Sequence, residues 1–284
     1  MSTALRRAAI VIVGATAFAV AQGAAAQANV LWTNSAGSNA ITAVDKATGA
    51  LIKQFNPGKG NGRGIVVVGN TVYYSVANSG TVFRLDANTG ADLGNAFTIA
   101  GATGLSTIAY DGTNFWVGDY SGTNQAYYVS PTGTLLKTIH LANCTSFCDG
   151  LEFFNGKLIS NRGDSVGGPY DVYDLNGNVL QASFINNTFG GGRGIAFDGT
   201  NFFIASASII YVYDGTTGAF IRQMTPGGTG QNYEDLSLDY NIVIPPVPVG
   251  PSVVNVPTLS QWSLIALLVM LSIAGAAALR RKQR

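Results

Sequence analysis

The chain has 284 residues, of which 47% are hydrophobic and only 11% are charged, and it contains 36 glycines. Because soluble domains usually carry roughly 25% charged residues, this composition favours turn-rich β structure over helices. Six of the 16 basic residues lie at the two ends, which leaves ten basic and 15 acidic residues between them, a net charge of −5. Nucleic acid is therefore not an expected partner.

Residues 1–27 predict a signal peptide. Arg6 and Arg7 form the positive start, residues 8–20 form the apolar run, and residues 24–28 are a small-residue cleavage region. The apolar run is too short and too rich in alanine for a comfortable membrane span. We therefore expect export through the Sec machinery and cleavage by signal peptidase.

Residues 28–241 contain an internal repeat. The turns that end in Gly49, Gly90, Gly133, Gly177 and Gly218 are spaced by 41, 43, 44 and 41 residues. A second series, at the strand starts Gly64, Gly104, Gly150 and Gly194, is spaced by 40, 46 and 44 residues. Several short strands in each period of this length are typical of a β-propeller blade.

The predicted fold is therefore all-β, a five-bladed β-propeller over residues 28–241. The first unit lacks an inner strand, and residues 235–240 supply one with nothing after it. We expect that last strand to complete the first blade and to close the ring, which removes exposed sheet edges. A six-bladed propeller with one degenerate unit is the alternative.

Residues that precede the inner strands are expected around the mouth of the central channel. Their opposite charges could bind a polar or carbohydrate ligand, or could pair with one another and plug the axis. The ligand-binding candidates are Arg63, Thr103, Asp149, Arg193, Glu234 and Asp235. A second group of polar residues ends the second strands: Asn34, Asn78, Asp119, Arg162 and Asp164.

No catalytic residue is predicted. His140 is the single histidine, at the end of an expected outer strand, where a surface position is expected. Asp149 and Glu234 are weak candidates for holding Ca²⁺ or Mg²⁺. Gluconolactonase-like propellers bind a cation at the axis, but no motif of that family is present, and a lyase of the virginiamycin type would need a catalytic histidine.

Cys144 and Cys148 are the two cysteines of the chain, four residues apart. In an exported protein a local disulfide is expected, and this one would constrain the loop that presents Asp149. A metal site would need further ligands that the neighbouring sequence does not clearly supply.

After the repeat the sequence changes character. Residues 242–255 contain four prolines among valines and predict an extended spacer. Residues 263–279 are an uncharged run behind Trp262, followed by a basic cluster at 280–284. An aromatic residue at one boundary and basic residues at the other predict a transmembrane helix with a cytoplasmic C-terminus.

A short motif precedes this predicted span, consisting of Val256, Pro257, Thr258, Leu259, Ser260, a variable residue and Trp262. With the apolar run and the basic tail, residues 256–284 resemble the IPTL-CTERM protein-sorting domain of Gram-negative bacteria. Val256 replaces the isoleucine of that family's pattern, and Ser263 replaces its glycine. The resemblance implies processing by an exosortase-like membrane enzyme and a mature body at the cell surface or outside the cell.

Three functions remain open from the sequence, one of them a passive matrix component, which would show no cleft. We favour a non-enzymatic propeller that binds a surface protein or a glycan. The alternative is an extracytoplasmic, cation-dependent hydrolase, lactonase or lyase with its site at the propeller axis. Coordination of a cation by Asp149 and Glu234 would favour the enzyme, and a mouth closed by ion pairs would favour the binding protein.

Overall fold

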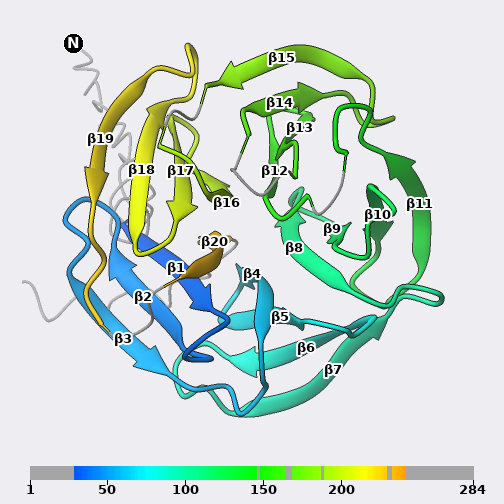
Figure 1. The fold of residues 1–284 in the computed structure, drawn as a ribbon. Coiled ribbons are helices and arrows are strands. Elements are labelled where there is room, and N and C mark those ends of the chain that lie inside the picture. The colour runs from blue at the N-terminus through cyan, green and yellow to red at the C-terminus, as the bar shows by residue number, and fades with distance from the viewer. Residues whose placement is uncertain (1–28, 146–147, 164–167, 187–188, 229–231, 241–284) are drawn as a thin grey trace, which may run out of the picture. The chain divides into compact units, whose positions relative to one another are not determined.

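The structure is a computed structural model that describes residues 29–145, 148–163, 168–186, 189–228 and 232–240. In this part of the chain all regular structure is β, arranged in one eight-stranded and three four-stranded sheets. The sheets surround a central axis, with β20 at the centre (Figure 1). The predicted all-β, propeller-like architecture is therefore confirmed. The predicted signal peptide, the spacer and the sorting tail lie outside the described residues.

The eight-stranded sheet divides into two antiparallel groups of four. The two groups are joined into one sheet where β20 and β4 run in parallel, with Asp239 opposite Val67 and Tyr240 opposite Val68. One group is β20 (Tyr233–Tyr240), β1 (Val30–Ser35), β2 (Ile41–Asp45) and β3 (Leu51–Phe55). The other is β4 (Gly62–Val68), β5 (Thr71–Val76), β6 (Thr81–Asp86) and β7 (Asp92–Thr98).

Each of the three remaining sheets is formed by four consecutive antiparallel strands. The first contains β8 (Leu105–Tyr110), β9 (Phe115–Asp119), β10 (Gln125–Val129) and β11 (Leu135–His140). The second contains β12 (Leu151–Phe154), β13 (Lys157–Asn161), β14 (Tyr170–Tyr173) and β15 (Val179–Ile185). The third contains β16 (Gly192–Phe197), β17 (Asn201–Ser206), β18 (Ile209–Asp214) and β19 (Phe220–Met224).

The last strand joins the first, as the incomplete first repeat predicts. β20 pairs with β1 in antiparallel register, with Leu31 opposite Leu238 and Thr33 opposite Leu236. The Thr33 hydroxyl also donates to the carbonyl of Asp235 over 3.0 Å. The two ends of the described chain therefore share one sheet, which couples the integrity of the whole ring to this pairing.

Apolar side chains pack between neighbouring sheets. The β8–β11 and β12–β15 sheets, for example, enclose a cluster that includes Trp116, Ile139, Leu158 and Tyr173, all of them buried. Similar clusters fill the other junctions between sheets. Because neighbouring sheets cover each other's faces, most residues of the inner and middle strands are buried, which accounts for the low charge of the sequence.

Basic side chains on three outer strands connect neighbouring sheets at the repeated turns. Lys53 donates to the carbonyl of Ala87 over 3.3 Å, and Lys137 to that of Leu175 over 2.7 Å. Arg222 donates to the carbonyl of Lys46 over 3.0 Å, which joins the last complete sheet to the first. The turns that mark the repeat therefore also serve as acceptors for the next sheet around the ring.

Glycines of three inner strands allow the neighbouring backbone to approach closely. A Cβ atom at Gly64 would lie 2.0 Å from the carbonyl oxygen of Ser106, and one at Gly150 would lie 2.1 Å from that of Arg193. At Gly194 it would lie 2.1 Å from the Cα atom of Asp235. These contacts are with backbone, so no side-chain rotation relieves them, and the repeated glycine of the sequence is a packing requirement at the axis.

Replacing Gly194 by alanine should therefore destabilise the protein by at least about 2 kcal/mol, because the β16–β20 contact must open to admit one methyl group. Urea unfolding followed by tryptophan fluorescence measures the effect. Gly37→Ala is the matched control, since a Cβ atom there would meet no atom within 4 Å. Equal stability of the two variants would contradict the packing argument.

Candidate functional site

The inner strands can be aligned through one shared acceptor. The backbone amides of Ile65 in β4 and Ile108 in β8 both donate to Oδ2 of Asp235, over 3.0 and 3.1 Å. This places Ser106 of β8 level with Arg63 of β4, two residues before the shared position. Gly104, the second glycine of the strand-start series, is therefore not the counterpart of Gly64. Thr107 of β8 occupies the position equivalent to Gly64.

Thr103 consequently lies outside the ring of residues at the mouth. The repeat predicts it there because it precedes Gly104, but the amide that binds Asp235 is that of Ile108, so the true counterpart lies three residues further along the chain. Ser106 takes the position, is almost fully buried, and donates from its hydroxyl to the carbonyl of Cys148 over 3.1 Å. The spacing carries a trace of this: the positions Gly64, Thr107, Gly150 and Gly194 are 43, 43 and 44 residues apart, whereas the glycines of the series are 40, 46 and 44 apart.

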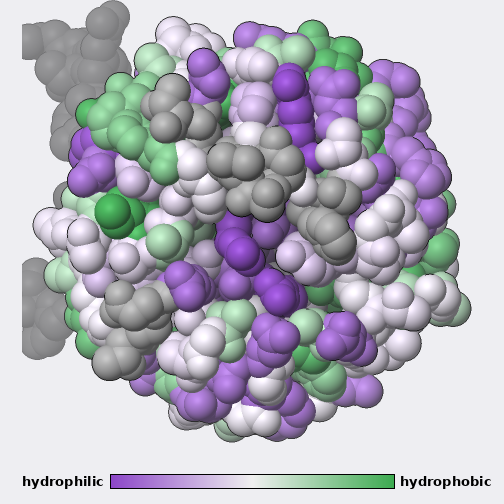
Figure 2. Space-filling model, in the orientation of Figure 1, coloured by the Kyte–Doolittle hydropathy of each residue, from purple (hydrophilic) through white to green (hydrophobic). Residues whose placement is uncertain are grey.

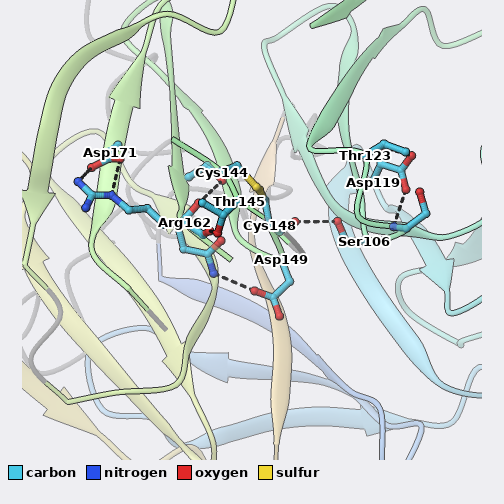
Figure 3. Close-up of a disulfide and its surroundings, with 12 residues drawn as sticks. Ser106, Asp119, Thr123, Cys144, Thr145, Cys148, Asp149, Arg162 and Asp171 are labelled. Atoms are coloured by element: carbon cyan, nitrogen blue, oxygen red, sulfur yellow. Dashed lines mark hydrogen bonds and ion pairs between the residues drawn. A yellow bond between two sulfur atoms is a disulfide. The ribbon is translucent and has the colours of Figure 1, made fainter. Parts of the chain in front are cut away.

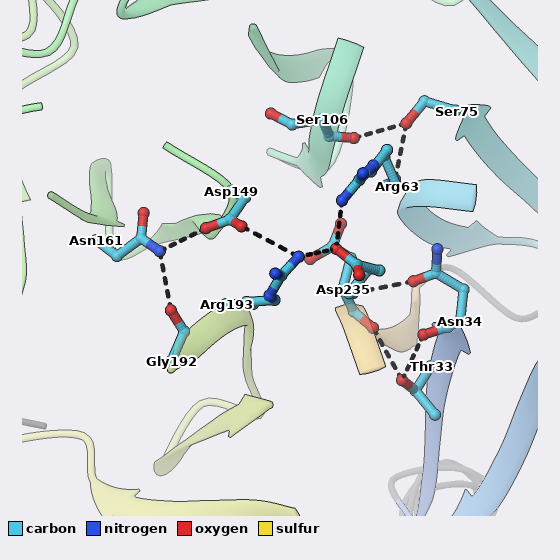
Figure 4. A network of polar contacts seen from close by, with 12 residues as sticks. Thr33, Asn34, Arg63, Ser75, Ser106, Asp149, Asn161, Gly192, Arg193 and Asp235 are labelled. Atoms are coloured by element: carbon cyan, nitrogen blue, oxygen red, sulfur yellow. Dashed lines mark hydrogen bonds and ion pairs between the residues drawn. The ribbon is translucent and has the colours of Figure 1, made fainter. Parts of the chain in front are cut away.

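Four of the predicted residues meet at the mouth as a chain of alternating charges (Figure 4). Nη1 of Arg63 donates to Oε2 of Glu234 over 2.9 Å. Arg193 donates to the same Glu234 oxygen and lies 3.6 Å from Oδ2 of Asp149. The order Arg63, Glu234, Arg193, Asp149 therefore has one guanidinium at one end and one carboxylate at the other. Figure 2 shows hydrophilic residues gathered at the centre of this face.

The members of this chain differ in exposure. The side chain of Glu234 is 6% exposed, whereas that of Arg193 is 36% exposed. Asp149 accepts a second hydrogen bond, from Nδ2 of Asn161 over 2.8 Å. Burial raises the pKa of Asp149 to about 6, although Asn161 and Arg193 oppose the rise. Glu234 is thus the central acceptor, and Arg193 is the member most accessible to solvent.

Asp235 is not part of the mouth but lies within the axis, fully buried. In addition to the hydrogen bonds from the Ile65 and Ile108 amides, its carboxylate accepts one from the Leu236 amide over 2.9 Å and one from the Thr107 hydroxyl over 3.1 Å. Burial raises its pKa well above the usual range, while these hydrogen bonds favour the charged form. These contacts assign Asp235 a structural role, because every hydrogen bond that its carboxylate accepts comes from an inner strand.

A second buried acid was not identified from the sequence. Glu152 of β12 is 2% exposed, and it accepts a hydrogen bond from the hydroxyl of Tyr240 in β20 over 3.0 Å. Burial raises its pKa well above the ordinary value. Glu152 stands in an otherwise apolar strand of four residues. The repeat in the sequence does not reveal which side chain of that strand points to the axis, so Glu152 could not be assigned to it.

A cavity of about 170 Å³ opens beside the mouth, between the β4–β7 group and the β8–β11 sheet. Arg63 lines it, and its guanidinium carbon lies 4.9 Å from the ring centre of Tyr120. The other polar lining residues include Asn61, Asn78, Thr103 and Ser121. Asn78 and Thr103 were both predicted near the mouth, and the structure brings them together in this cavity with Arg63.

Cys144 and Cys148 are paired at disulfide distance, as the sequence predicts, with their Cα atoms 6.1 Å apart (Figure 3). Both are buried. Asp149 directly follows Cys148, whose carbonyl is held by Ser106, so the paired cysteines precede the residue that ends the charge chain. Figure 3 also shows Arg162, which binds both carboxylate oxygens of Asp171 over 2.7 and 2.8 Å.

The remaining candidates of the second group are tied into the fold. Asn34 accepts from the Asp235 amide over 2.9 Å. Asp119 accepts from the Ser121 amide and from the hydroxyls of Thr123 and Tyr127, over 2.7 to 2.8 Å. Asp164 lies outside the described residues. His140 is exposed at the end of β11, the position that the sequence predicts for it.

Within the described residues, no cluster of three or more histidine, cysteine or acidic side chains is arranged to hold a metal ion. Asp149 and Glu234 do not face a common open position, because Arg193 lies between them. In the same part of the chain, no helix has the length and apolar character needed to cross a bilayer. Residues 256–284, with the motif residues Val256 to Ser260 and Trp262, are not among those described.

Comparisons with known proteins add little to this geometry. No protein-family model matches the chain, and no curated protein sequence matches it significantly. A solved structure that it resembles is a glutaminyl cyclase of Myxococcus xanthus, at 15% sequence identity and a TM-score of 0.46. The match covers 58% of this chain and 70% of that one.

Replacing Glu234 by glutamine should destabilise the fold by about 3 kcal/mol, because it leaves two guanidinium groups without their buried partner. Asp92→Asn is the matched control, since the pair between Lys59 and Asp92 is more exposed, 23% and 48%, and should change stability by less than about 1 kcal/mol. Chemical denaturation at neutral pH measures both. Similar losses in the two variants would show that the mouth is not a buried network.

Asp149 should make the protein less stable as the pH rises. Its pKa of about 6 in the fold exceeds the ordinary value of 3.8, so the folded state holds a proton that the unfolded state releases between these values. The difference in unfolding free energy between wild type and Asp149→Asn should fall as the pH rises from about 4 to 6. Urea titrations across this window measure it. A difference that grows with pH would mean that pairing with Arg193 outweighs burial.

Proposed function

We propose that this chain is an exported binding protein, a five-bladed β-propeller at the cell surface or released from it, which holds a protein or glycan partner at its axial mouth. The two antiparallel groups of the eight-stranded sheet and the three separate sheets would each be one blade. The paired β1 and β20 support this count, because they supply the inner strand that the first repeat lacks.

The observation that carries the proposal is the chain of ion pairs at the mouth. A cation-dependent hydrolase or lactonase would need the oxygens of Asp149 and Glu234 for the metal. Arg63 and Arg193 both form ion pairs with the carboxylate of Glu234, and Arg193 also lies beside that of Asp149. A cation would have to displace two guanidinium groups. Arg193, 36% exposed, is instead suited to bind a polar partner by charge-assisted hydrogen bonds.

We further propose that the chain is an inner-membrane precursor, held by a helix over residues 263–279 and released by an exosortase-like enzyme. The uncharged run behind Trp262 and the basic cluster at 280–284 support the membrane span, and the motif over residues 256–262 supports the processing.

Isolation of the mature protein from cell fractions tests both parts. Mass spectrometry should place the N-terminus near residue 28 and should find no peptide that contains Arg284 in surface material. The isolated protein should bind to cells of its own strain, and Arg193→Gln should weaken binding by about tenfold, since one charged contact is lost. Prior treatment of the cells with glycosidases or with a protease identifies the class of partner.

Arg84→Gln is the control for that binding test, because Arg84 is exposed on β6 and donates to the nearby carbonyl of Leu93. It should bind as the wild type does. Binding that is equal for wild type and Arg193→Gln would remove the mouth from the proposal. An intact Arg284 in most surface material would contradict release by a sorting enzyme.

A further inference from the structure

The cavity lies beside the one position of the mouth that carries no charged side chain. The level that carries Arg63, Asp149, Arg193 and Glu234 on four inner strands carries the small side chain of Ser106 on β8. Ser106 turns its hydroxyl to the carbonyl of Cys148 and so does not contact the guanidinium of Arg63. Arg63 instead lies over the ring of Tyr120, and the space between the two sheets stays open.

Polar groups that line this cavity have no partner within the described part of the protein. The side-chain amides of Asn61 and Asn78 and the hydroxyl of Thr103 make no hydrogen bond there, and all three residues are exposed. Elsewhere near the axis, comparable amides are used by the fold: Asn161 donates to the carbonyl of Gly192 over 3.0 Å, and Asn34 accepts from Asp235. The cavity therefore concentrates unused donors and acceptors.

The electrostatics of the cavity favour an anion. Arg63 is the terminal cation of the charge chain, and its one acidic partner, Glu234, is shared with Arg193. Within the described residues, Arg63 donates a hydrogen bond only through Nη1, although a guanidinium carries five donors. None of the described residues that line the cavity is acidic. A carboxylate that enters would therefore meet a partly neutralised guanidinium and no opposing charge from the wall.

Size and lining together indicate the class of ligand. A volume of about 170 Å³ is smaller than the roughly 300 Å³ at the low end of pockets for drug-sized ligands, so it admits a single small ring. The two amides and the Thr103 hydroxyl suit the several hydroxyl groups of a sugar, and the Tyr120 ring supplies an apolar wall. Arg63 supplies the site for one negative charge.

We propose that this cavity binds one carboxylated monosaccharide unit, of the uronic acid type, within a surface glycan. The carboxylate pairs with Arg63, and the hydroxyl groups of the sugar bind Asn61, Asn78 and Thr103. The proposal rests on the proposed function, since it names the ligand class for the same face of the propeller. The cavity lies beside the mouth, so neighbouring sugars of the chain would extend across Arg193.

The test is titration of the purified full-length protein with glucuronate, galacturonate, methyl glucoside and acetate, followed by ligand-observed NMR. At least one uronate should bind at least about tenfold more tightly than the neutral glycoside, which lacks the charge, and than acetate, which lacks the hydroxyl groups. Equal binding of uronates and methyl glucoside would overturn the role of Arg63. Equal binding of acetate and uronates would overturn the assignment to a sugar.

Asn78→Asp adds a negative charge to the cavity wall and should weaken uronate binding at least about tenfold. Asn155→Asp is its matched control, because Asn155 is also an exposed asparagine with positive φ, 48° against 58° for Asn78, but lies in the β12–β13 turn. It should bind as the wild type does. If the two variants behave alike, the cavity is not the site.

The two proposals can fail separately. If uronates do not bind but the mature protein still binds cells in an Arg193-dependent way, the cavity assignment is wrong and the proposed function stands. If uronates bind in an Asn78-dependent way but the protein ignores the cell surface, the cavity assignment stands and surface binding does not.

Discussion

The buried carboxylate of Asp235 is the contact on which the geometry of the axis depends. It accepts backbone amides from β4 and β8 and the hydroxyl of Thr107, while its own strand pairs with β1. The side chain and the strand pairing together thus connect the β1–β3 strands, the β4–β7 group and the β8–β11 sheet. An isolated carboxylate at this depth would be costly, and three amides and a hydroxyl are what make it tolerable. The positions of Arg63 and Ser106 follow from this anchor, because both lie two residues before the amides that it binds.

The same anchor accounts for the division between a closed mouth and an open cavity. Around the axis, four positions at one level carry long charged side chains, and these have enough reach to pair across the channel. The fifth carries serine, which is too short to join them. Charged groups that satisfy one another offer little to a ligand. Beside Arg63, by contrast, the side-chain amides of Asn61 and Asn78 and the hydroxyl of Thr103 make no hydrogen bond to the described residues. The proposed binding site therefore lies next to the repeat that carries serine.

Much of the fold could be predicted from the sequence, because the features that define it are local. The turns that end in glycine need a left-handed residue, and Gly49, Gly90, Gly133, Gly177 and Gly218 all have positive φ, between 70° and 90°. Such turns leave a spacing that can be counted. The missing inner strand of the first repeat likewise predicted the pairing of β1 with β20, because an unpaired inner edge at the axis would leave buried amides without acceptors.

The site was less predictable, for a physical reason that Thr103 illustrates. Four of the mouth residues were identified because each stands directly before the close-packed position of its strand or on β20 itself. Thr103 was placed with them because it precedes a glycine, but Gly104 has no close neighbour, its nearest contact for a Cβ atom being 3.8 Å away. The close approach in that sheet is made at Thr107, where a hydroxyl bonds with Leu151 and Asp235 in place of a bare Cα. A glycine can mark a tight contact or simply a loop, and the hydrogen bond from the Ile108 amide to Asp235 distinguishes the two. Thr103 instead lines the cavity beside Arg63, next to the one position of the mouth that carries no charged side chain.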